Sequence, residues 1–88
     1  MKTNYKNAYE VIKEMTKNFK EVEHWGYKYT EMTEKEFDEI KAEVLANATK
    51  DFGKQFDRYS YVSKRSNGEK RAQLRTYHHT YVDIIIKD

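Results

Sequence analysis

Residues 59–77 read YSYVSKRSNGEKRAQLRTY. Asn67-Gly68 between alternating residues is the strongest short-range signal for a β-hairpin, because both residues readily adopt the positive φ of a type I′ turn. With these two residues at the centre of the turn, Tyr61 is predicted to lie opposite Leu74. The fold is therefore expected to be organised around a C-terminal antiparallel hairpin.

The predicted register separates two faces, because side chains alternate with a period of two along a strand. One face is expected to meet the core and carries Tyr59, Tyr61, Ala72, Leu74 and Thr76. The other face is cationic and aromatic and carries Arg58, Val62, Lys64, Arg71, Gln73, Arg75 and Tyr77. Arg65 and Lys70 flank the turn.

Two amphipathic helices are predicted ahead of the hairpin, over about residues 4–25 and 34–52. In the first, apolar residues recur at alternating spacings of three and four. The second is expected to begin after Thr33, since Thr33 and Glu36 have the spacing of a capping box. Gly26 and Gly53 are expected to end the two helices.

The predicted fold class is α+β, with two long helices packed on one face of the hairpin or small sheet, in the order ααββ. The strands are expected at about 56–66 and 69–87, and a short extra edge strand near Tyr27-Tyr29 is a further option. Whether the last strand is continuous or bends at His78-His79 stays open. At 88 residues the chain is expected to form one domain, 1–88.

Composition bounds the class of protein. There is no cysteine, which suits a reducing compartment, and no stretch approaches the roughly 20 apolar residues of a membrane span. A soluble, cytoplasmic protein without membrane contact is expected. The charge divides unevenly: residues 54–88 hold eight Lys/Arg against four Asp/Glu, whereas residues 1–53 hold nine against eleven.

Catalytic motifs are lacking. The chain has no cysteine nucleophile, no glycine-rich phosphate loop and no Gly-x-Ser-x-Gly elbow. His78 and His79 are adjacent, so in a strand they point to opposite faces and cannot share a metal ion. We therefore expect no enzymatic activity, no metal site, no cofactor and no small-molecule substrate.

Binding of nucleic acid by the basic hairpin is the leading functional hypothesis. Between Arg58 and Arg75, six cations face a single acid, Glu69. Cations spread over a rigid surface suit phosphate contacts, and an exposed aromatic ring suits stacking on a base. The expected binding residues are Arg58, Lys64, Arg65, Lys70, Arg71, Arg75 and Tyr77. Edge strands also carry Lys and Arg simply to prevent aggregation, so a role without a ligand remains the alternative.

A protein partner is the second functional hypothesis. Eight tyrosines in so short a chain exceed what a core requires, and Tyr and Arg are enriched at interface hot spots. The small size and the wealth of Lys, Asn and Tyr are typical of mobile-element or phage accessory proteins that inhibit or regulate a host nucleic-acid enzyme, including the anti-CRISPR type. No family motif distinguishes the two hypotheses.

Overall fold

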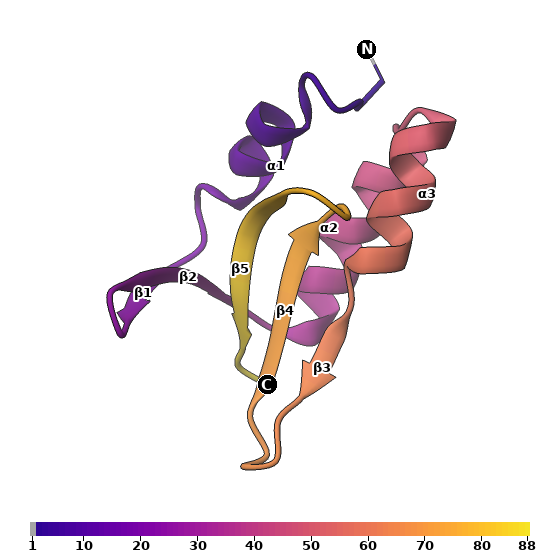
Figure 1. Ribbon diagram of the computed structural model, residues 1–88. Helices are drawn as coiled ribbons and strands as arrows, with labels where there is room; N and C mark the ends of the chain where they lie inside the picture. Colours follow the sequence, from indigo (N-terminus) through magenta and orange to yellow (C-terminus); the bar gives the residue numbers. More distant parts are fainter. Residues whose placement is uncertain (1) are drawn as a thin grey trace.

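The structure is a computed structural model that describes residues 2–88, and this part of the chain contains three helices and five strands (Figure 1). In chain order the elements are α1 (Ala8–Thr16), β1 (Glu21–His24), β2 (Tyr27–Met32), α2 (Glu34–Ala46), α3 (Lys50–Tyr59), β3 (Val62–Lys64), β4 (Lys70–Arg75) and β5 (Thr80–Ile86). The α+β class is confirmed, but the described residues contain one helix and three strands more than the predicted ααββ arrangement.

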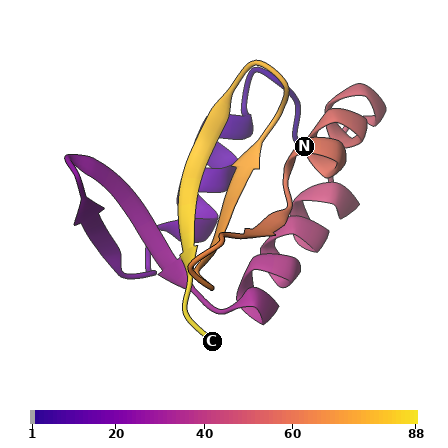
Figure 2. The same cartoon turned by 60° about the horizontal axis from the view of Figure 1, so that its bottom comes forward.

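The strands form one mixed sheet in the order β1-β2-β5-β4-β3. β5 pairs parallel with β2 and antiparallel with β4, so it joins the N-terminal strands to the C-terminal ones. The three helices pack on one face of this sheet: α2 lies behind β4 in Figure 1, and α1 lies behind β4 and β5 in Figure 2. We call the face turned away from the helices the outer face.

The core lies between the sheet and the helices. Ala72, Leu74, Val82, Ile84 and Ile86 alternate along β4 and β5 and are buried, as the period of a strand facing a core requires. From the helices and β2, they meet Ala8, Ile12, Met32, Phe37, Ile40, Val44, Phe52 and Phe56. The predicted core positions Ala72 and Leu74 of β4, and Thr76 just after it, are therefore confirmed.

The hairpin at Asn67-Gly68 exists, but its predicted register is wrong by one residue. Arg65 N–H donates to the Glu69 carbonyl at 2.7 Å, so the loop has three residues, and Gly68 at its end has φ +88°. Three-residue loops end in such a left-handed residue and use Asn-Gly as readily as two-residue loops. Val62 consequently pairs with Ala72. The faces of β3 are the reverse of those predicted: Val62 lies on the core side, and Tyr61 is 61% exposed.

The predicted helix over residues 4–25 is also wrong in its extent, because α1 ends at Thr16. Residues 21–32 instead form the β1–β2 hairpin, in which His24 pairs with Tyr27 around Trp25-Gly26. Gly26 therefore serves a turn and does not end a helix. The optional strand near Tyr27-Tyr29 is confirmed as β2, although the edge position belongs to β1.

The second predicted helix begins where expected and ends too early. Thr33 Oγ1 accepts from the Glu36 N–H at 3.1 Å, and Glu36 Oε1 accepts from the Thr33 N–H at 2.8 Å, which is a complete capping box. α2 stops at Ala46 because Thr3 pairs with the chain there: its N–H donates to the Asn47 carbonyl, and its carbonyl accepts from the Thr49 N–H.

Residues 50–59 form the additional helix α3, so the strand predicted over 56–66 is wrong for its first part. Gly53 lies inside α3 and does not end a helix. A Cβ atom at Gly53 would lie 3.2 Å from the Cβ of Ala48, so the glycine allows α3 to pack closely against the preceding turn. Arg58, predicted on a strand, lies in the last turn of this helix.

The strand predicted over 69–87 is two strands. The chain reverses at Thr76–His79, where the Thr76 N–H donates to the His79 carbonyl at 2.8 Å. Leu74 pairs with Val82 but Arg75 pairs with Thr80, so Tyr81 sits in a bulge. The bulge turns Tyr81 toward the helices, where its ring lies 6.2 Å from that of Phe52.

Thr33→Ala should lower the free energy of unfolding by about 1 kcal/mol, because the Glu36 N–H at the start of α2 loses its acceptor. Glu36→Ala should lower the free energy of unfolding by less than Thr33→Ala does, because the Thr33 N–H that loses its acceptor lies outside the helix and is only partly buried. Urea denaturation of the two variants beside the wild type measures both values. An unchanged midpoint for Thr33→Ala would contradict the role of the cap.

Gly68→Val should lower the free energy of unfolding by about 1 kcal/mol or more, because a β-branched residue is strained at positive φ. No atom lies within 4 Å of the position that a Cβ would take, so the whole effect comes from the backbone conformation. Gly68→Asn is the matched control, since Asn tolerates the left-handed region. Thermal unfolding should therefore rank the wild type first, then Gly68→Asn, then Gly68→Val.

Candidate functional site

The outer face contains a hollow of about 270 Å³ over β4 and its neighbouring strands. Its lining combines arginines, tyrosines and small polar groups from both halves of the chain: Tyr29, Tyr59, Tyr61, Ser63, Arg65, Arg71, Ala72, Gln73, Arg75, Asp83 and Ile84. The side chains of Arg71, Gln73 and Arg75 point toward it because the alternate residues Ala72 and Leu74 are buried on the side of the helices. Burial of the core thus determines which side chains of β4 are available to a ligand.

Arg71 lies at the centre of this face and is held from two sides. Its Nη2 is 2.8 Å from Oε2 of Glu69, and its guanidinium carbon is 5.7 Å from the centre of the Tyr29 ring. The side chain is only 17% exposed, and its Nε has no hydrogen-bond partner among the described residues. Arg71 thus lies on the face turned away from the helices, as its predicted strand face requires, but Glu69 and Tyr29 cover most of its side chain.

Arg75 is fixed by a chain of hydrogen bonds along the outer face. It donates to Gln73 Oε1 at 3.1 Å, and Gln73 Nε2 donates to Asp83 Oδ1 at 2.6 Å. Further Arg75 nitrogens donate to the carbonyls of Thr76 and Tyr77. A planar guanidinium held in this way keeps one orientation.

Arg65 and Tyr61 form the outer margin of the hollow on and beside β3. Both are exposed, and they stand on the same side of the strand as Ser63. Within residues 2–88 the Arg65 guanidinium makes no ion pair, in contrast to Arg71. Of the three arginines that line the hollow, Arg65 is therefore the one whose charge is most available to a ligand.

Arg58 and Tyr77 lie at the rim of the same face, next to Tyr59. The Arg58 guanidinium lies 5.5 Å from the Tyr59 ring centre, and the rings of Tyr59 and Tyr77 are also 5.5 Å apart. Tyr77 is 56% exposed in the turn before β5. The predicted aromatic platform thus belongs to a cluster of rings beside the hollow.

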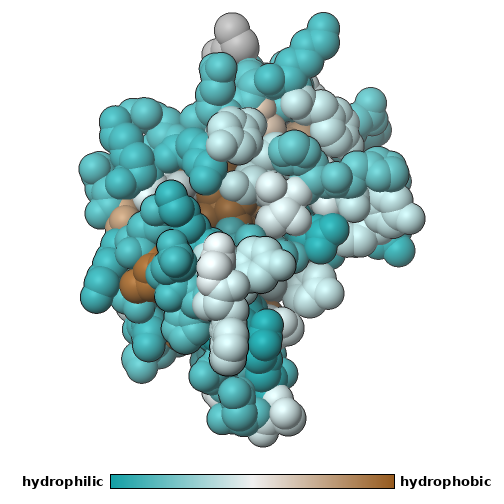
Figure 3. Space-filling model, turned by 60° about the vertical axis from the view of Figure 1, so that its left-hand side comes forward, coloured by the Kyte–Doolittle hydropathy of each residue, from teal (hydrophilic) through white to brown (hydrophobic). Residues whose placement is uncertain are grey.

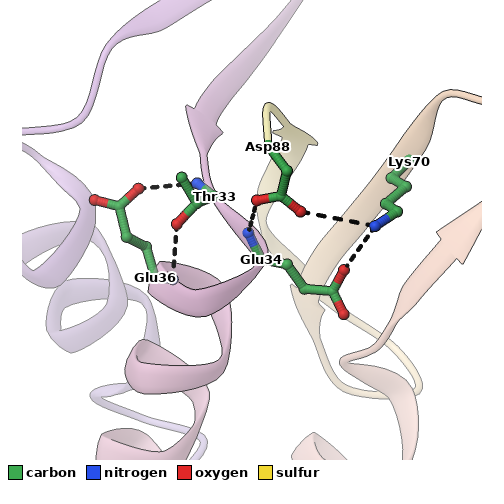
Figure 4. A network of polar contacts seen from close by, with 5 residues as sticks. All are labelled: Thr33, Glu34, Glu36, Lys70 and Asp88. Atoms are coloured by element: carbon green, nitrogen blue, oxygen red, sulfur yellow. Dashed lines mark hydrogen bonds and ion pairs between the residues drawn. The ribbon is translucent and has the colours of Figure 1, made fainter.

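Lys64 and Lys70 do not join this group, because they pair with each other across β3 and β4 on the opposite side of the hairpin. Lys70 lies in the polar network of Figure 4, where its Nζ is 3.0 Å from Glu34 Oε1 and 3.7 Å from Asp88 Oδ2. Asp88 Oδ1 accepts the Glu34 N–H at 2.9 Å. The hydrogen bond and the charge of Glu34 raise the pKa of Lys70 above its ordinary value.

Of the residues predicted from the sequence, Arg65, Arg71 and Arg75 line this hollow, whereas Tyr29, Tyr59 and Tyr61, which also line it, were not among the predicted binding residues. Tyr61 was assigned to the core because the register was set one residue off. Tyr29 comes from the other half of the chain, and only the parallel pairing of β2 with β5 brings it here. The alternation in Tyr27-Lys28-Tyr29 was the one local signal for it.

The arrangement provides guanidinium groups and aromatic rings without a nucleophile beside a base. Among the described residues, no three His, Cys, Asp or Glu side chains come together as a metal site would require. Guanidinium groups bind phosphate and carboxylate, and tyrosine rings stack on planar groups. The face is therefore suited to a ligand that is both anionic and planar.

Residues 2–88 contain no helix with the length and apolar character needed to cross a lipid bilayer. A side view shows a mostly hydrophilic surface with a small hydrophobic area in a depression (Figure 3). No protein-family model, curated protein or solved structure matches this chain.

The Lys70 network should make stability depend on alkaline pH. A raised pKa means that the folded state binds the proton more tightly than the unfolded chain, so this stabilisation is complete below about pH 10.5 and is lost as the pH rises through the folded-state pKa. Lys70→Gln should therefore be less stable than the wild type at pH 8. The difference between the two proteins should shrink as the pH rises through the folded-state pKa of Lys70, as followed by urea denaturation at each pH. A difference that is independent of pH would contradict this role of the charge.

Proposed function

We propose that this chain is a small non-enzymatic binding protein that contacts nucleic acid with the outer face of its sheet. The observation that carries the proposal is the hollow in which Arg65, Arg71 and Arg75 stand beside Tyr29 and Tyr61. Guanidinium groups neutralise phosphates, and tyrosine rings offer stacking surfaces for bases. Arg58 and Tyr77 extend the same surface at its rim. Lys64 and Lys70 lie on the opposite side of the hairpin and contribute only to its overall positive electrostatic potential.

Pre-organisation supports this assignment. Arg75 is already oriented by Gln73 and by two carbonyls, and Arg71 is stacked on Tyr29. Side chains that are ordered before binding lose less conformational entropy when the ligand arrives. A long surface Arg that served only to prevent edge-to-edge aggregation would not require such fixation.

A protein partner is the second candidate, and the acids of the outer face favour it. Glu69 pairs with Arg71, and Asp83 accepts a hydrogen bond from Gln73. These two carboxylates make the positive electrostatic potential of this face weaker than its arginines alone would produce. Tyr and Arg are also hot-spot residues of protein interfaces. In this role the chain would be a regulator or inhibitor of a nucleic-acid enzyme, of the kind found among phage and mobile-element proteins.

Arg65→Gln should weaken binding of a labelled oligonucleotide about three- to tenfold in a fluorescence anisotropy titration, because one available phosphate contact disappears. Lys64→Gln is the matched control: it removes the same charge from the neighbouring residue on the opposite side of β3 and should change affinity less. Log affinity should also fall linearly with log salt, with a slope of about −0.7 for each phosphate contact to a single strand.

Two results would contradict the nucleic-acid proposal. Absence of binding by the folded wild type at low salt would reject it and leave the protein partner as the working hypothesis. Equal losses in Arg65→Gln and Lys64→Gln would show that net charge alone matters, and the outer face would no longer be the site.

A further inference from the structure

The tip of the β1–β2 hairpin carries the most exposed large hydrophobic side chain of the described residues. Trp25 is 95% exposed, and its neighbour Tyr27 is 68% exposed. The hairpin projects from the body of the molecule in both ribbon views (Figures 1 and 2). Placing these rings in water gains nothing from the hydrophobic effect, so the packing of this fold does not explain them.

The backbone at the tip disfavours tryptophan as well. Trp25 has φ +54° and Gly26 has φ +82° in a two-residue loop between paired His24 and Tyr27, as in a type I′ turn. Asn or Asp is preferred at the first of these positions, whereas a bulky residue with positive φ is an outlier. Trp25 is thus both exposed and strained, which is a combination found where a side chain serves a ligand.

The two sides of this hairpin differ in chemistry. Val22 is paired with Tyr29, and His24 with Tyr27, so these four residues share one side. The acids Glu21 and Glu23 share the other side with Lys28, whose Nζ lies 3.8 Å from Glu21 Oε1. The first side is aromatic near the tip, and its one carboxylate within β1 and β2, Glu31, lies at the base of the hairpin, where β2 pairs with β5.

The aromatic side continues the outer face. The rings of Tyr29 and His24 are 6.3 Å apart, and Tyr29 also lies under the Arg71 guanidinium at 5.7 Å. A second hollow, of about 350 Å³, is lined by His24 and Arg71 together with Lys70, Lys87 and the acids Glu69 and Asp88. One surface therefore runs from the arginines of β4 across Tyr29 to the hairpin tip.

We propose that the β1–β2 hairpin is a second part of the binding site and receives unpaired bases of a single-stranded nucleic acid, with Trp25 and Tyr27 as stacking surfaces. This inference rests on the proposed function, since the arginines of the outer face hold the phosphates. Stacking on these rings requires bases that are not paired, so single strands are the ligand and duplex is not. Glu21 and Glu23 lie on the opposite side of the hairpin and Glu31 lies at its base, so no carboxylate of β1 or β2 stands beside the tip on the side of these rings.

The test uses two readouts on the full chain. Anisotropy of labelled oligothymidylate reports binding, and the intrinsic fluorescence of Trp25, the single tryptophan of the sequence, reports stacking. We expect the tryptophan emission to be quenched in proportion to the bound fraction with oligothymidylate. With a duplex of equal length the emission should stay nearly unchanged.

Trp25→Asn is the decisive variant, because it creates the Asn-Gly pair that a type I′ turn prefers. Its melting temperature should equal or exceed that of the wild type, while its affinity for oligothymidylate should fall about tenfold. Duplex affinity should change little. Glu23→Gln, on the other side of the hairpin, is the control and should retain or slightly raise the affinity for single strands.

The outcomes separate this inference from the proposed function. If the wild type binds oligothymidylate but Trp25→Asn binds equally well, or the emission stays unchanged at saturation, the hairpin is not part of the site and only this inference is overturned. An equal loss of duplex and single-strand affinity in Trp25→Asn also overturns it. If the wild type binds neither ligand at low salt, the proposed function fails and this inference fails with it.

Discussion

Burial of one side of β5 is the constraint on which the rest of the structure depends. This strand is the only element among the described residues that pairs with both halves of the sheet, through β2 on one side and β4 on the other. Val82, Ile84 and Ile86 bind it to the helices. Because side chains alternate, the same burial turns Asp83 outward and sets Gln73 and the two arginines of β4 opposite the helices. The candidate site is thus a consequence of the core.

Polar contacts at the end of β5 fix the sheet to the helical layer. Asp88 caps the first N–H of α2, which the positive end of the helix dipole favours, and it also pairs with Lys70 at the start of β4. Glu34 completes the link from the helix to Lys70. These contacts hold the N-terminal end of β4, next to Arg71. Lys70 was predicted as a binding residue, but in the structure it links β4 to α2 and to Asp88.

The parts of the fold that were predictable from the sequence are those with local causes. The capping box at Thr33 and the left-handed glycine at residue 68 each depend on a few neighbouring residues, and both were found. The break after Ala46 depends on hydrogen bonds to Thr3, more than forty residues away, and the reversal at Thr76–His79 contains neither Gly nor Pro. The apolar residues within 19–25 are compatible both with one face of a helix and with the alternation of a strand. Only the pairing with β2 makes this segment a strand.

The same distinction applies to the candidate site. Arg65, Arg71 and Arg75 are close in sequence, so their density alone indicated a binding surface, whereas Tyr29 joins them only through the topology of the sheet. The assembled face combines a fixed centre with exposed ends. Arg71 and Arg75 are held by a ring, a carboxylate and backbone carbonyls, while Arg65 and Trp25 stand exposed at two separate turns. A fixed centre limits the entropy lost on binding, and exposed ends can adapt to a ligand of variable shape. A flexible, repetitive polymer is the kind of ligand for which both properties are useful at once.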